Sequence, residues 1–300
     1  EGLYVHGSVA LGHRRLSILD LSAAGRQPMT NEDGTLWLTF NGEIYNFQEL
    51  RRELSARGHR FRSQTDAEVI LHLYEEEGDE CLQRLEGMFA FALWDAKARR
   101  LLLARDRLGE KPLHYLVFPG GLAFASELKA LRAVPEFTGE LSGPSLRRYL
   151  AFEYVPAPDT IYRGVSKLLP GHLLVHEDGR LTEQEYWRVR YRPLKPESEA
   201  ASAEQLRELL TRSVRRRLAS DVPLGVFLSG GMDSSAVVAA MAGAVSSRIQ
   251  TFHIRFNEPG FDESDYARIV ADRFATEHHV EVLDGAAARR FIPRMFDYLD

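Results

Sequence analysis

Short apolar runs separated by turn residues fill the first half of the chain. Strands are predicted over 36–40, 101–104, 113–118 and 122–125, the first ending at Asn41-Gly42 and the last two joined by a hairpin turn at 119–121. Apolar residues at helical spacing predict helices over 47–57 and 66–76, the second of which begins at Thr65-Asp66. Clustered strands with helices between them are typical of an α+β layered domain.

The periodicity weakens in the middle of the chain, and this region predicts a domain boundary. Prolines break the run from 139 to 169, which we interpret as a connector, and 171–175 with 181–189 predict a hairpin around Asp178-Gly179. The proline-rich, charged run at 192–198 predicts a linker. We therefore expect a first domain at 1–190, a linker at 191–203 and a second domain at 204–300.

Helices and strands alternate regularly in the last third of the chain. The predicted order is helix 204–218, strand 224–228, helix 234–242, strand 249–256, helix 263–274 and strand 278–282. This alternation is typical of an α/β domain with a parallel sheet and helices on its faces.

The first of these strands runs directly into the sequence SGGMDSS, residues 229–235. Gly230 and Gly231 allow positive φ and a close approach of the backbone, and the helix that follows points its free N–H groups at the same place. Hydroxyl groups of Ser229, Ser234 and Ser235 add donors, so the loop fits a phosphate. Because Asp233 would repel a phosphate unless a cation lay between them, it predicts Mg²⁺. A plain turn with Asp233 or Ser234 as a helix N-cap would explain only one of these residues.

Composition narrows the class of protein. The 300 residues carry a net charge of −5, with a sequence pI near 6.1, which argues against partners such as nucleic acid or a membrane surface. Cys81 is the single cysteine, which excludes an internal disulfide framework and fits a reducing cytoplasm. A first residue other than Met and an end without a closing signal suggest an excerpt from a longer protein.

Three polar residues in the first half would suit a free amino acid. The guanidinium of Arg15 suits an α-carboxylate, and the carboxylate of Asp66 suits an α-ammonium. Asn41 with the Gly42 N–H could form an oxyanion hole. Taken singly, Arg15 and Asp66 are more often a surface charge and a helix cap, so it is their combination that favours a clamp.

Blocks along the whole chain are similar to glutamine-hydrolysing asparagine synthetase. They are GHRRLSILD (12–20), NGEIYN (41–46), TDAEVI (65–70), GMFAFALWD (87–95), RDRLGEKPL (105–113), SELKAL (126–131), DVPLGVFLSGGMDSS (221–235) and FDESDYA (261–267). The resemblance implies a glutaminase domain with the αββα fold of N-terminal-nucleophile hydrolases, followed by a truncated α/β ATP-pyrophosphatase synthetase domain. It further implies the substrates glutamine, aspartate and ATP, with ammonia passing between the domains.

The resemblance also implies roles for individual residues. The glutamine pocket would be lined by Arg15, Leu16, Ser17, Ile18, Leu19, Asn41, Gly42, Glu43 and Asp66. Leu228 and Ile254 would contact the nucleotide, while Ser229, Gly230, Gly231, Asp233, Ser234 and Ser235 would hold pyrophosphate and Mg²⁺. A homodimer is kept open as the assembly.

The catalytic nucleophile of this family is an N-terminal cysteine, and no residue of the chain matches it. Residue 1 is Glu1. Cys81 follows a predicted helix and has no histidine or oxyanion turn beside it in the sequence, which favours a buried structural thiol. Two alternatives therefore stay open beside asparagine synthesis. One is a related amidotransferase that acts on another carboxylate, and the other is a relative that binds nucleotide without catalysis.

Overall fold

The computed structural model describes residues 1–191, 198–257 and 260–299, and residues 192–197 of the predicted linker lie outside this description. The chain divides into two compact units, Glu1–Tyr191 and Arg192–Leu299, which we describe separately. Within the described residues, no helix is both long and apolar enough to span a lipid bilayer.

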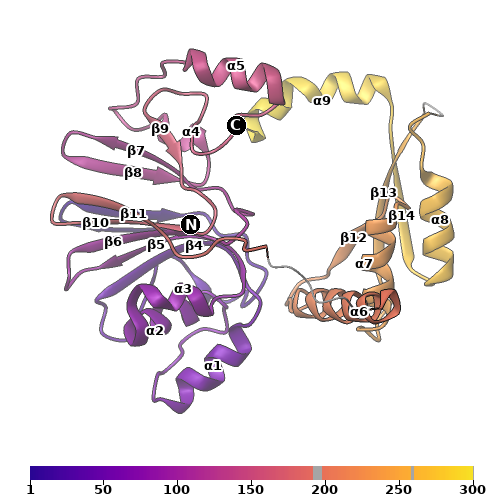
Figure 1. Ribbon diagram of the computed structural model, residues 1–300, viewed down its shortest axis with the longest axis horizontal. Helices are drawn as coiled ribbons and strands as arrows, with labels where there is room; N and C mark the ends of the chain where they lie inside the picture. The colour runs from indigo at the N-terminus through magenta and orange to yellow at the C-terminus, as the bar shows by residue number, and fades with distance from the viewer. Residues whose placement is uncertain (192–197, 258–259, 300) are drawn as a thin grey trace. The chain divides into compact units, whose positions relative to one another are not determined.

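A six-stranded sheet organises the first unit (Figure 1). Its order is β11 (Arg180–Glu185), β10 (His172–Glu177), β6 (Arg100–Arg105), β5 (Gly87–Asp95), β4 (Leu36–Ile44) and β3 (Met29–Thr30), and all neighbouring strands are antiparallel. The predicted hairpin around Asp178-Gly179 is confirmed as β10–β11. Apolar residues dominate the central strands because both faces of this sheet are covered.

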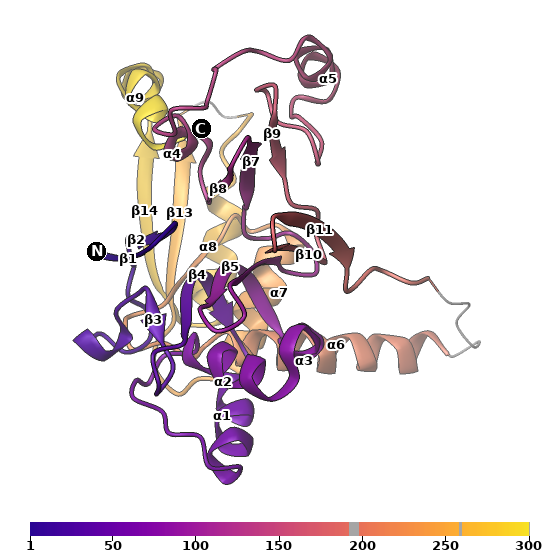
Figure 2. The ribbon, with the colours of Figure 1, turned by 90° about the vertical axis from the view of Figure 1, so that its left-hand side faces the viewer.

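Three helices cover one face of this sheet, as Figures 1 and 2 both show. They are α1 (Phe47–Ala56), α2 (Glu68–Glu77) and α3 (Cys81–Arg84), the last two linked by a 3₁₀ turn, Gly78–Glu80. The stretch from Glu68 to Leu73 is buried, so α2 is enclosed nearly all round rather than on the single face that its spacing predicted. A further 3₁₀ turn, Ala23–Gly25, lies in the loop after the strand β2 (Val9–His13).

Smaller sheets cover the opposite face. One is β8 (Gly121–Ala125), β7 (His114–Phe118) and β9 (Val165–Lys167), and the other is β1 (Gly2–His6) with β2 (Val9–His13). Alternate residues of β7 and β8, such as Tyr115 and Phe124, join a core with Ala90, Ala92 and Leu103 of the large sheet. Leu116 and Ala123 face the other way and pack with α4 (Leu128–Leu131). The unit is therefore layered helix–sheet–sheet–helix, which confirms the predicted αββα class.

Two predictions in this unit were wrong. Asn41-Gly42 does not end a strand, because β4 continues to Ile44 and pairs along its whole length with β5. The connector predicted from 139 to 169 contains the helix α5 (Gly143–Phe152) and the strand β9. Pro144 was misread as a helix breaker, but it lies in the first turn, where no N–H is needed, and the side chain of Ser142 caps that turn.

The second unit has the predicted parallel sheet, in the order β12 (Gly225–Phe227), β13 (Gln250–Phe256) and β14 (Glu277–Leu283). The helices are α6 (Glu199–Arg216), α7 (Met232–Ala242), α8 (Ser264–Arg273) and α9 (Gly285–Tyr298). Because the side chain of Ser198 caps it, α6 begins five residues before the predicted start at 204, inside the expected linker. No helix had been predicted where α9 lies.

The two faces of this parallel sheet differ. Thr251 and His253 are buried on the face that packs with the helices, where Leu228 meets Val238 of α7 and Ala267 of α8. The other face, which we call the open face, presents Phe227, Phe252, Ile254 and Phe256, all exposed. Phe252 stacks there on His279 of the neighbouring strand, with ring centroids 4.9 Å apart.

Candidate functional site

A cavity of about 720 Å³ opens in the first unit between the loop after β2, the strand β4 and the start of α2. Its lining includes eight of the nine residues predicted for the glutamine pocket: Arg15, Leu16, Ile18, Leu19, Asn41, Gly42, Glu43 and Asp66. Ser17 is not among the lining residues. Residues up to about 50 positions apart in the sequence are thus brought to one place.

Arg15 orders the loop at the cavity rim. Its guanidinium donates hydrogen bonds to the carbonyl oxygens of Asp20, at 2.9 Å, and Leu19. A Cβ added at Gly25 would lie 2.4 Å from this group, so the backbone of Gly25 is packed against it. These two hydrogen bonds use two of the five guanidinium N–H donors.

Asn41 and Gly42 form part of the cavity floor from inside β4. The amide nitrogen of Asn41 donates to the Ser126 hydroxyl at 3.3 Å. A Cβ on Gly42 would lie 2.1 Å from the Met88 carbonyl oxygen, so only glycine allows β5 this close. The geometry of these two residues comes from sheet register rather than from a turn.

Asp66 is a buried carboxylate just before α2. Its Oδ2 accepts a hydrogen bond from the Ile44 N–H at 2.7 Å, which ties α2 to the end of β4. Burial raises the pKa of Asp66 to about 6, and the nearby charge of Glu43 acts in the same direction. A cation in the cavity would relieve both effects, so the site favours an ammonium group.

Sequence reasoning missed His13, which also lines the cavity. Its Nε2 lies 2.9 Å from the Phe40 carbonyl oxygen, while the buried Nδ1 has no hydrogen-bond partner among the described residues. Burial lowers the pKa of His13, so the neutral ring donates from Nε2 and leaves Nδ1 as an acceptor. His13 lies two residues before Arg15 in the block GHRRLSILD (12–20), and this position could have marked it as a pocket residue.

The serine–glycine loop of the second unit joins β12 to α7. Gly230 has φ +84°, and a Cβ there would lie 2.5 Å from the backbone of Tyr266 and Ala267, so the loop packs closely against α8. Ser229 Oγ accepts from the Gly231 N–H at 3.2 Å and lies 3.1 Å from Ser234 Oγ.

Further predicted residues surround the same helix start. Gly231 is the N-cap of α7, and the Ser235 hydroxyl donates to its carbonyl oxygen at 2.7 Å. Asp233 is exposed in the first turn of α7. Leu228 is buried, so its side chain belongs to the core of this unit, and Ile254 lies on the open face.

His253 holds this loop in place through two contacts of its ring, and it was not identified from the sequence. Its Nδ1 lies 2.9 Å from the Leu228 carbonyl oxygen and its Nε2 lies 3.1 Å from Ser264 Oγ. The buried ring therefore links the end of β12 to the start of α8.

Cys81 lies apart from the cavity lining, in the first turn of α3. It is buried, which confirms that prediction, and burial raises the pKa of its thiol. A thiol that stays protonated is a poor nucleophile, so this residue does not replace the missing cysteine.

Comparisons with known proteins agree with this two-part organisation. A glutamine amidotransferase domain matches residues 1–187, and an asparagine synthase domain matches residues 205–300. Asparagine synthetase [glutamine-hydrolyzing] 1 of Bacillus subtilis is 36% identical over the whole chain and 47% of its own length. A putative asparagine synthetase [glutamine-hydrolyzing] 2 of Methanocaldococcus jannaschii is 37% identical over 93% of the chain and 58% of its own length.

One relative bears a different name. Amidase chyE of Penicillium rubens is 35% identical over 95% of the chain and 44% of its own length. The chain spans about half the length of the curated relatives that it matches. With its amidotransferase and asparagine synthase domains in this order, the chain belongs to the glutamine-hydrolysing asparagine synthetase family.

Proposed function

We propose that the whole protein transfers ammonia from glutamine to aspartate, which ATP first activates as an adenylate with release of pyrophosphate. This chain would supply the glutamine pocket and the nucleotide loop, with domain limits of 1–190 and 204–300. Support comes chiefly from the cavity in the first unit, where a guanidinium and a buried carboxylate face one space.

Within that cavity, the residues would divide the work by charge. Arg15 would pair with the α-carboxylate of glutamine, and Asp66 with Glu43 would attract its α-ammonium. Asn41 with the Gly42 N–H would stabilise the oxyanion that forms during attack on the side-chain amide. The attacking thiolate would come from the N-terminal cysteine of the family, for which this chain has no counterpart.

In the second unit, ATP would bind with its phosphates at the start of α7. The N–H groups of that turn and the hydroxyls of Ser229, Ser234 and Ser235 would contact pyrophosphate. Ile254 would contact the rest of the nucleotide with its side chain, whereas Leu228, whose side chain is buried in the core, would do so only through its backbone. Asp233 is the residue that would hold Mg²⁺, whose charge lowers the repulsion between this carboxylate and phosphate. The α7 start fits this role because Ser229 and Asp233 are exposed beside it.

The decisive experiment is calorimetric titration of the chain with L-glutamine, D-glutamine and glutaramate, which lacks the α-ammonium. We expect binding of L-glutamine alone, and its loss in Asp66→Asn. Equal binding of glutaramate and L-glutamine would contradict the assignment of Asp66. For the second unit, Mg²⁺-dependent AMP formation by the whole protein should fall in Asp233→Asn.

A different acceptor is the second candidate, and it is kept because one relative of comparable identity, amidase chyE, bears a name other than asparagine synthetase. AMP formation by the whole protein with aspartate, compared with other carboxylates, separates the two. If another carboxylate supports AMP formation and aspartate does not, that carboxylate is the acceptor. If no carboxylate supports it, the protein is the relative that binds nucleotide without catalysis. A cytoplasmic location is part of the proposal, while a homodimer stays open as the assembly.

A further inference from the structure

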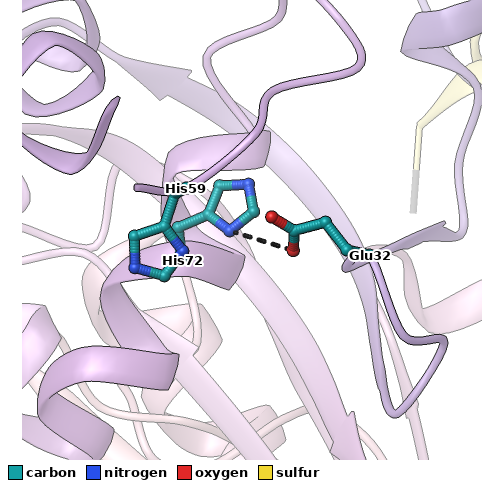
Figure 3. Close-up of side chains that lie close together, drawn as sticks. All are labelled: Glu32, His59 and His72. Carbon is teal, nitrogen blue, oxygen red and sulfur yellow. Dashed lines mark ion pairs between the residues drawn. The ribbon is translucent and has the colours of Figure 1, made fainter. Parts of the chain in front are cut away.

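A second group of polar side chains lies outside the cavity, on the helix layer of the first unit. Glu32 comes from the turn between β3 and β4, His59 from the loop after α1, and His72 from α2. One ligand atom from each lies within 4.8 Å of the other two. Figure 3 shows the two imidazole rings and the Glu32 carboxylate gathered at this point.

His72 is the buried centre of the group, with 1% of its side chain exposed. Its Nδ1 lies 2.9 Å from Glu75 Oε2 and 3.6 Å from Glu32 Oε2. Among the residues that the structure describes, its Nε2 has no hydrogen-bond partner, and it lies 3.9 Å from the buried carboxylate of Glu68. Metal-bound histidines commonly direct the second nitrogen at such a carboxylate, which fixes the ring orientation.

His59 is turned toward the same point by a carboxylate on its outer side. Its Nε2 lies 2.9 Å from Glu76 Oε1, and its Nδ1 lies 3.4 Å from Glu75 Oε2. With Nε2 acting as the donor to Glu76, Nδ1 keeps its lone pair for a ligand. The two rings lie 4.7 Å apart, centroid to centroid.

Two acidic side chains are held so that one oxygen of each faces the rings. The Arg60 N–H donates to Glu32 Oε1 at 3.0 Å, which leaves Oε2 toward His72. The amide of Asn31 donates to Glu75 Oε1 at 2.8 Å, which leaves Oε2 between the two imidazoles. Each potential ligand is therefore oriented by a second contact.

We propose that Glu32, His59 and His72 bind a divalent first-row transition metal, Zn²⁺ above all, with Glu75 as the fourth ligand. Two imidazoles with carboxylates suit Zn²⁺ and Co²⁺, whereas Mg²⁺ and Ca²⁺ prefer oxygen ligands alone. The metal would connect the β3–β4 turn, the loop after α1 and α2, and Glu68 and Glu76 would position the histidines.

To bind the ion, the ligand atoms, which lie within 4.8 Å of one another, would have to move closer together. Tetrahedral ligands about 2.1 Å from a zinc ion lie about 3.4 Å from one another. Two separations already fall near this value, His59 Nδ1 to Glu75 Oε2 at 3.4 Å and His72 Nδ1 to Glu32 Oε2 at 3.6 Å, and Glu32 is exposed enough to move and to admit the ion. A proton is the competing occupant, since it could be shared between His72 and the same carboxylates.

Titration of the chain with Co²⁺, followed by visible absorption, tests the proposal, with Zn²⁺ competition and thermal unfolding as further readouts. We expect one Co²⁺ per chain with the intense absorption of a tetrahedral site, displaced by Zn²⁺. Zn²⁺ should also raise Tm, and EDTA should reverse the rise. His59→Gln and Glu32→Gln should each weaken Co²⁺ binding at least ~10-fold.

His6→Gln is the matched control, because His6 is an exposed histidine of the same unit, away from these ligands, and should bind Co²⁺ as the unmodified chain does. If His59→Gln fails to fold, Glu32→Gln alone decides, since Glu32 lies in an exposed turn. A chain that binds no Co²⁺, or that binds it equally after Glu32→Gln, overturns the proposal and leaves the proton as the occupant.

Discussion

The charge of Asp66 bears on both stability and ligand binding. Burial raises its pKa to about 6, so the native state holds a proton there between about pH 4 and pH 6 that the unfolded chain releases. The contribution of Asp66 to the free energy of unfolding is therefore fully present below about pH 4 and is lost as pH rises through 6. At about 1.4 kcal/mol per pH unit, the raised pKa corresponds to a cost of about 3 kcal/mol at pH 7.

Asp66→Asn should remove that pH dependence. The Asn Oδ1 can still accept from the Ile44 N–H, so the variant should gain stability relative to the unmodified chain as pH rises from about 4 to 7. Urea unfolding at several pH values in this range measures the difference. A difference that stays constant with pH would show that Asp66 is already ionised throughout.

Arg15 is proposed to bind the α-carboxylate of glutamine, and its substitution tests that role. In the whole protein, Arg15→Ala should abolish glutamine-dependent AMP formation but keep that driven by added ammonia, because the adenylation that we propose takes place in the other unit. Losing a desolvated charge-assisted pair costs about 2 to 5 kcal/mol, two to three orders of magnitude in affinity. Arg52→Ala, on the exposed side of α1, is the control.

The loop 14–25 complicates this test, since Arg15 also bonds the carbonyl oxygens of Leu19 and Asp20. Arg15→Lys separates the two roles, because lysine keeps the charge without the planar fork. If Arg15→Ala reduces synthesis from ammonia and from glutamine equally, Arg15 is a structural residue and the glutamine assignment fails.

At the scale of elements, two adjacent glycines in the β12–α7 loop should behave differently. Gly230→Ala places a side chain at φ +84° and 2.5 Å from the α8 backbone, so it should destabilise this loop by at least about 1 to 3 kcal/mol. Gly231→Ala should fold normally, since φ is −67° and, of the described atoms, its Cβ would meet only Ser229 Oγ, at 3.3 Å.

Hydrogen–deuterium exchange over β12 and α7 measures this difference. Faster exchange is expected for Gly230→Ala alone. Gly231→Val should keep slow exchange in the whole protein but lose ATP binding, because its branched side chain would occupy the proposed phosphate position. Unchanged ATP affinity in Gly231→Val would argue against a phosphate at this loop.

The sequence predicted those secondary-structure elements that neighbouring residues specify by themselves. The β7–β8 and β10–β11 hairpins and the parallel sheet were predictable because turn residues and alternation mark them directly. The continuation of β4 through Asn41-Gly42 was not, because it depends on pairing with β5 from another part of the chain. His59 and His72 carry no joint motif, since only packing of α2 brings them together.

At the scale of the whole molecule, the chain should not release ammonia from glutamine despite its cavity. The only thiol is buried in α3 and outside the cavity lining, so no thiolate can attack a bound amide. An ammonia assay on the chain and on Cys81→Ser should give the same background. Hydrolysis that disappears in Cys81→Ser would show that the buried thiol reaches substrate.

The open face of β12–β14 should affect how the chain behaves in concentrated solution. It presents Phe227, Phe252, Ile254 and Phe256 to solvent, and apolar surface of this kind adsorbs hydrophobic dyes and other copies of the chain. We expect bright fluorescence with anilinonaphthalene sulfonate and light scattering that grows with concentration, both reduced in Phe227→Ser. Purification at low concentration, in a buffer free of kosmotropic salts such as sulfate, should keep the chain dispersed.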